Sequence, residues 1–88
     1  MSKQSFFVEV TDTYGGEANY CWANRYKVSA TSFRGAIGKV ARLSGLKFRN
    51  AGDYGDLARY NARRAAICAF VSYWDDDSHG GYLHVETI

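Results

Sequence analysis

Apolar residues recur at every third or fourth position across residues 31–45, which is the spacing of one face of an α-helix. The positions that share this face are Phe33, Ala36, Ile37, Val40, Ala41 and Ser44. A hydroxyl of Ser32 or Thr31 is placed to cap the N-terminus, and Gly45 suits the left-handed backbone at which many helices end. The pattern therefore predicts one short amphipathic helix. Its basic residues fall away from the apolar face: Arg34, Lys39 and Arg42.

Alternation of apolar and polar residues before the helix predicts a β-hairpin. Residues 5–11 and 20–30 both alternate, and a glycine-containing loop at 12–16 joins them, so we expect an antiparallel pair. In the second strand, Arg25 and Lys27 fall on the face that points away from the core, together with several aromatic residues of the sheet.

Strand patterns also follow the helix. In chain order the sequence predicts a short strand at 46–49, a loop at 50–56, a central strand at 65–74, a turn at 75–81 and a last strand at 82–86. The central strand is apolar on both faces, which is typical of a strand covered on both sides. Residues 57–64 fit two interpretations, a half-apolar helix or a strand over 57–60 that turns near 61–64, and the strand is preferred.

Together these elements predict one α+β domain over residues 1–88: an antiparallel β-sheet with one amphipathic helix packed on one face. The order is β-β-α-β-β-β, or β-β-α-(β)-β-β-β when the short strand at 46–49 is counted. A chain of 88 residues has no room for a second domain. The longest uncharged run, 65–74, is too short to cross a bilayer, and the first ten residues lack the pattern of an export signal. We therefore expect a cytoplasmic protein.

Charge is unevenly distributed along the chain, although the net charge is only +2. Residues 18–52 contain no acidic residue and seven basic ones, namely Arg25, Lys27, Arg34, Lys39, Arg42, Lys47 and Arg49. Such segregation creates a field that a mixed surface cancels. Aromatic residues interleave with the basic ones, as on surfaces that stack bases and hold phosphates. Three interpretations are open: ordinary solvated charge, a nucleic-acid contact or a protein contact.

Three adjacent carboxylates, Asp75, Asp76 and Asp77, are the sharpest local feature. They can be a solvated turn, a contact for a basic patch on a partner, or ligands of a divalent cation. No calcium-loop spacing follows them, and His79 and His84 lack the pattern of a zinc site. We predict no metal and no cofactor.

The sequence shows no catalytic signature. Its histidines and cysteines occur without a nucleophile motif, and Gly35 and Gly38 lie inside the helical segment, so they do not form a phosphate-binding loop. The two glycines would instead let a strand or a partner approach the helix closely. Cys21 and Cys68 are expected to be reduced thiols that pack as small buried hydrophobes. We predict that the protein is not an enzyme.

One strand runs directly into the capped helix through residues 28–32 (VSATS), and Ala36, Val40 and Ala41 follow on the apolar face. With the stretches GEANYCWANRY and DLARYNARRAAICAF, this layout resembles small single-domain proteins of phages and mobile elements. Some anti-CRISPR proteins share the arrangement of a single helix on a bent antiparallel sheet. The resemblance implies an inhibitor that acts in the cytoplasm of a bacterial host cell.

Two functional hypotheses follow. The first is a small non-enzymatic binding protein that blocks a host defence protein or nucleoprotein complex of the CRISPR type by steric and charge occlusion. Its contact surface would be the basic residues, which would meet an acidic or nucleic-acid surface, or the acidic turns, which would meet a basic groove: Asp53, Asp56 and Asp75 to Asp77. The alternative is direct nucleic-acid binding by the basic segment 18–52, with an affinity that falls steeply with salt. A monomer or a homodimer fits either hypothesis, and neither needs a membrane.

Overall fold

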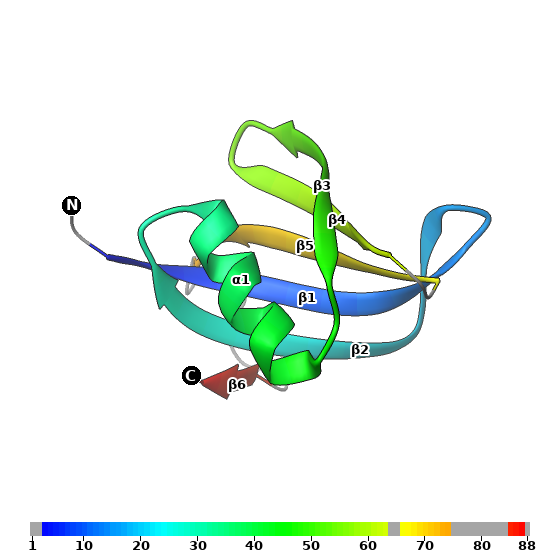
Figure 1. Ribbon diagram of the computed structural model, residues 1–88, viewed down its shortest axis with the longest axis horizontal. Helices are drawn as coiled ribbons and strands as arrows, with labels where there is room; N and C mark the ends of the chain where they lie inside the picture. Colours follow the sequence, from blue (N-terminus) through cyan, green and yellow to red (C-terminus); the bar gives the residue numbers. More distant parts are fainter. Residues whose placement is uncertain (1–2, 64–65, 75–84, 88) are drawn as a thin grey trace.

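The computed structural model describes residues 3–63, 66–74 and 85–87. The elements follow in the order β1 (Gln4–Tyr14), β2 (Glu17–Ala30), α1 (Phe33–Ser44), β3 (Phe48–Tyr54), β4 (Leu57–Ala62), β5 (Ile67–Tyr73) and β6 (Val85–Thr87). The strands form one sheet in the order β3-β4-β5-β1-β2-β6, and α1 lies across one face of it (Figure 1). This confirms the predicted α+β class. The first five strands pair antiparallel, whereas β6 runs parallel to β2.

Helix α1 forms as its sequence predicts. The Ser32 hydroxyl accepts a hydrogen bond from the Gly35 backbone N–H at 3.1 Å, so it satisfies one of the donors that a helix N-terminus leaves unpaired. Gly45 ends the helix with φ of 74°, a left-handed conformation that glycine adopts without a steric penalty. The buried helical residues are Ala36, Ile37 and Val40.

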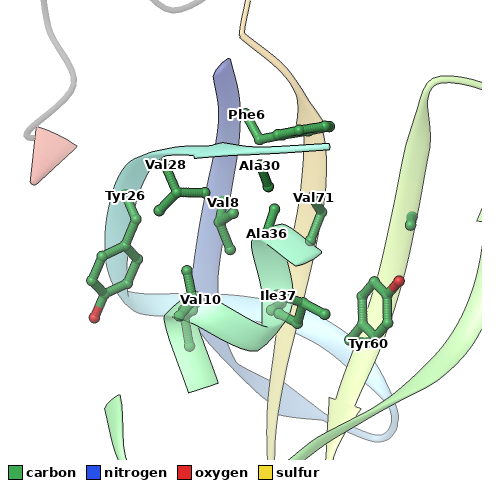
Figure 2. Close-up of a cluster of buried hydrophobic side chains, with 13 residues drawn as sticks. Phe6, Val8, Val10, Tyr26, Val28, Ala30, Ala36, Ile37, Tyr60 and Val71 are labelled. Carbon is green, nitrogen blue, oxygen red and sulfur yellow. The ribbon is translucent and has the colours of Figure 1, made fainter. Parts of the chain in front are cut away.

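The core lies between α1 and the sheet. Strand β1 contributes Phe6, Val8 and Val10 to it, because alternate residues of a strand point to the same face. Val8 pairs with Tyr26 on β2 and with Val71 on β5, so three neighbouring strands present buried side chains toward the helix. Figure 2 shows Val8 and Val71 around Ala36 of α1, with the Tyr26 ring at the side of the cluster. A fully buried valine stabilises a fold by about 1.5–3 kcal/mol relative to an exposed one.

The first hairpin is longer than its sequence predicts. Strand β1 continues through Tyr14, and only Gly15 and Gly16 form the turn, with φ of 63° and 89°. Two glycines with positive φ make the tight turn that matches the twist of antiparallel strands. The expected loop at 12–16 is therefore wrong, because the turn needs two residues and leaves the others free to pair.

A bulge interrupts this hairpin opposite Asp12. The register shifts there, and residues 19–22 of β2 have no partner in the ladder. The Asp12 carboxylate holds the bulge: it accepts hydrogen bonds from the Asn19 amide at 2.9 Å and from the Cys21 backbone N–H at 3.0 Å. The hydrogen bond from Asn19 contributes most to a lowered pKa of the Asp12 carboxyl. Between these anchors, Tyr20 adopts φ of 56°, a conformation that costs a non-glycine residue about 1–2 kcal/mol.

Strand β3 corrects a second sequence prediction. Residues 50–56 were expected to be a loop because they are rich in glycine, asparagine and aspartate, yet β3 extends to Tyr54. Tertiary pairing with β4 outweighs the weak strand propensity, and a register shift between Asn50 and Gly52 accommodates the poor strand formers as a β-bulge. The strand interpretation of residues 57–64 is confirmed by β4.

Strand β5 confirms the predicted central strand, since it pairs with both β4 and β1. The predicted acidic turn at 75–81 and the first part of the predicted last strand, 82–84, lie outside the described residues. Strand β6 overlaps the end of that prediction.

Candidate binding groove

A groove runs between the N-terminal part of α1 and the β3–β4 hairpin. Its volume is about 820 Å³, within the range of clefts that take ligands. The lining residues are Ser32, Phe33, Arg34, Ile37, Gly38, Phe48, Arg49, Asn50, Asp53 and Tyr60. In Figure 1, β3 and the turn to β4 stand away from the sheet beside α1. We call this site the α1–β3 groove.

Apolar side chains form the floor of the α1–β3 groove. Ile37 and Tyr60 are both 5% exposed and belong to the core. Phe33 and Phe48 are half-buried and pack against the same core. The Phe33 ring meets Phe6 edge-on, with 5.5 Å between ring centroids. The floor is thus continuous with the core, which makes it a rigid surface.

Gly38 leaves the helical wall of the groove without a side chain. A Cβ atom added there would meet no heavy atom of the described residues within 4 Å, the helix's own nearby backbone aside, so the space beside it is open to these residues. Gly35 differs, because an added Cβ would lie 3.3 Å from the Cβ of Ala30. Close packing against β2 explains Gly35. It does not explain Gly38, where glycine lowers helix propensity by about 1 kcal/mol relative to alanine.

Two arginines border the groove from opposite sides. Arg34 lies in the first turn of α1 and Arg49 lies on β3, and both are exposed. Within the described part of the chain, neither forms an ion pair, and the first turn of α1 contains no acidic residue. Asp53 also lines the groove and accepts a hydrogen bond from the Asn50 amide at 3.1 Å. The charged groups of the groove therefore favour an anionic group near the two arginines.

The other basic residues of the segment 18–52 lie elsewhere. Lys39 donates a hydrogen bond to the Ser29 carbonyl on β2, so its ammonium group is held against the sheet. Arg42 and Lys47 are exposed but do not line the groove. The seven predicted basic residues are thus dispersed, and the groove brings together two of them.

Arg25 and Lys27 lie on the face of the sheet opposite α1, as predicted. Arg25 forms an ion pair with Glu9 at 3.0 Å between Nε and the carboxylate. The Lys27 ammonium lies 4.8 Å from the centroid of a Trp74 ring, which is the geometry of a cation–π contact. Both cations of this face already have a local partner, so they are less available to a distant anion than the groove arginines.

Arg59, which the sequence did not single out, adds a third cation to this opposite face. It lies 5.9 Å from the centroid of Phe70 and donates a hydrogen bond to the Gly16 carbonyl at the hairpin turn. Beneath it, Cys68 is fully buried, and burial raises the pKa of its thiol. Arg59 therefore links β4 to the β1–β2 turn and contributes to the stability of the fold.

The cysteines differ in exposure. Cys68 is buried, as predicted, whereas Cys21 is exposed because it lies in the bulge of β2, outside the regular alternation. Among the residues with a described position, no three His, Cys, Asp or Glu side chains gather as metal ligands would. Asp75, Asp76 and Asp77 lie outside the described residues, as do His79 and His84.

The sequence pointed to part of this groove. Arg34 and Arg49 belonged to the predicted basic set, and Gly38 was expected to admit a close neighbour. Phe48 is one of the aromatic residues that interleave with the basic ones, and Asp53 is one of the predicted acidic contacts. Asn50 and Tyr60 were missed, because the sequence predicts a loop from residue 50 on. The signal that could have found them is Gly55-Asp56 between two short alternating runs, which is typical of a hairpin turn.

No α-helix in the described ranges has both the length and the apolar character needed to traverse a bilayer. Comparisons with protein-family models, with curated proteins and with solved structures find no match to this chain. The resemblance to small phage and anti-CRISPR proteins therefore stays a prediction.

Proposed function

We propose that this chain is a non-enzymatic binding protein and that the α1–β3 groove holds an anionic segment of its partner. The observation that supports this proposal is the position of Arg34 and Arg49. Two exposed arginines, neither of which forms an ion pair with a described residue, border one apolar-floored groove from two different elements. An arginine presents several N–H donors in a planar fork, so a pair of them suits carboxylate or phosphate groups.

The partner remains the one that the sequence suggested: a protein or nucleoprotein complex of bacterial defence, blocked by occlusion. A domain of this size would act by covering a functional surface of the complex. Direct nucleic-acid binding is the second candidate. It is supported by the half-buried rings of Phe33 and Phe48 beside the arginines. It is weakened by the dispersal of the other basic residues and by Asp53, whose carboxylate would repel phosphates.

A pull-down with the tagged protein from a bacterial lysate, with and without nuclease, tests the proposal. The variant is the double charge reversal Arg34→Glu/Arg49→Glu. The matched control is Arg42→Glu/Lys47→Glu, which changes the net charge equally but leaves the groove intact. We expect a stoichiometric complex that survives nuclease, is lost with the groove variant and is kept with the control.

Two other results of the pull-down would contradict the proposal. Equal recovery with both variants would refute the groove as the contact site. Recovery that collapses on nuclease treatment would favour the nucleic-acid candidate instead. Circular dichroism of both variants establishes that they are folded before either result is interpreted.

A further inference from the structure

We infer that the occupant of the α1–β3 groove is an extended acidic peptide segment, which adds to the free edge of β3 as a further strand. This inference rests on the proposed function, because it uses the same groove and the same arginines. It goes further by naming the chemical class of the ligand and the backbone that binds it.

Strand β3 has a free edge within the described sheet. It is the terminal strand of the order β3-β4-β5-β1-β2-β6 and pairs with β4 alone. Edge strands carry backbone N–H and C=O groups without a strand partner, and an extended peptide can pair with them. This mode of binding requires that the edge be reachable from the groove.

The lining of the groove indicates that an occupant of the groove can reach the free edge of β3. Phe48, Arg49 and Asn50 are consecutive in β3, and all three line the groove. Phe48 and Asn50 share a face of the sheet with Tyr60 of β4, because Asn50 pairs with Tyr60. Arg49, between them, points to the other face and still lines the groove, so the groove reaches past this face to the edge of β3. The bulge between Asn50 and Gly52 ends the regular stretch and limits pairing to residues 48–50.

The helical wall leaves room for a backbone. Gly38 faces open space where any other residue would place a side chain. A strand that pairs with β3 lies about 4.8 Å from it and passes between β3 and α1. The absence of a side chain at Gly38 is the feature that keeps this passage wide.

The chemistry of the groove favours a peptide over a nucleic-acid strand. The ring of Phe33 packs edge-on against Phe6, and its centroid lies 4.9 Å from that of the Tyr73 ring, so the core covers part of its surface and leaves less of it for stacking with a base. Two arginines and one carboxylate, Asp53, suit separated acidic side chains better than an unbroken row of phosphates. Side chains that alternate along the added strand would place acidic groups at the arginines and apolar groups on the floor.

Selection from a display library of random peptides, about twelve residues long, tests the inference. The wild-type protein is the bait, with counter-selection on Arg34→Glu/Arg49→Glu. We expect enriched sequences in which acidic and apolar residues alternate. The best of them is then synthesised with and without N-methyl groups on alternate backbone amides, which removes the donors that strand pairing needs. Methylation should weaken binding at least about tenfold.

The outcomes distinguish a failure of this inference from a failure of the proposed function on which it rests. Enrichment without acidic residues, no enrichment, or full tolerance of N-methylation would overturn strand addition of an acidic peptide. A labelled thymidine oligonucleotide is titrated in parallel. If it binds and loses affinity with the groove variant alone, the groove still binds an anionic partner, but the peptide inference fails. If neither probe depends on Arg34 and Arg49, the proposed function fails as well.

Discussion

Two glycines of α1 allow one substitution to be compared in two environments. Replacing glycine by alanine inside a helix contributes up to about 1 kcal/mol of helix propensity. At Gly38 the new methyl group meets nothing within 4 Å, so the gain should appear almost in full. At Gly35 the methyl group would lie 3.3 Å from the Cβ of Ala30, which is attached to the backbone of β2 and cannot rotate away. We expect Gly38→Ala to stabilise the protein by about 0.5–1 kcal/mol and Gly35→Ala to give less.

Thermal and urea unfolding followed by circular dichroism measure this difference. For a domain of this size, the stabilisation at Gly38 corresponds to a rise in Tm of roughly 2–8 °C. The slope of the urea transition should not change, since neither substitution alters the surface exposed on unfolding. The reasoning would be refuted if Gly38→Ala left the stability unchanged, or if Gly35→Ala stabilised the protein more. The first result would mean that the space beside Gly38 is filled in solution.

Further predictions concern the cap, the bulge and the thiols. Ser32→Ala should lower the free energy of unfolding by about 1 kcal/mol, measured in urea, while Ser32→Asp should preserve it. The hydrogen bond from Asn19 lowers the pKa of the Asp12 carboxyl below its ordinary value of 3.8. The ionised carboxylate therefore stabilises the fold above that ordinary pKa, and this stabilisation is lost as the pH falls through the lowered pKa. Unfolding measured against pH should show this loss, and Asp12→Asn should remove it. A thiol reagent should modify the exposed Cys21 in the native state and reach the buried Cys68 only on unfolding, whereas equal rates would contradict the fold.

Local sequence patterns predicted most of the fold. The helix followed from its apolar spacing, from the hydroxyl of Ser32 and from Gly45, and all of these act within a few residues of one another. The central strand followed from an apolar run on both faces. The errors occurred where distant pairing decides the structure. The bulge at residues 19–22 depends on Asp12 across the hairpin, and strand β3 depends on β4.

The candidate site was harder to predict for the same reason. A run of basic residues in the sequence became separate groups in space, because β2 directs Arg25 and Lys27 to one face of the sheet while α1 covers the other. Arg34 and Arg49 are brought together by the way the chain returns after α1 to form β3. Local alternation predicts a strand at 46–49, but pairing with β4 and the packing of Phe48 against the core, which no local pattern encodes, place that strand beside α1.

The separation of the seven basic residues into groups determines how strongly salt should weaken the binding of an anionic partner. If a single-stranded nucleic acid contacts only Arg34 and Arg49, two counterions are released from it, and the logarithm of affinity should fall with the logarithm of salt concentration with a slope of about −1.4. A nucleic acid that wrapped the protein and engaged all seven basic residues of segment 18–52 would give about −5. Titration at several salt concentrations therefore discriminates a groove contact from a wrapped one. A steep slope that persisted in the Arg34→Glu/Arg49→Glu variant would mean that the dispersed cations, not the groove, hold the partner.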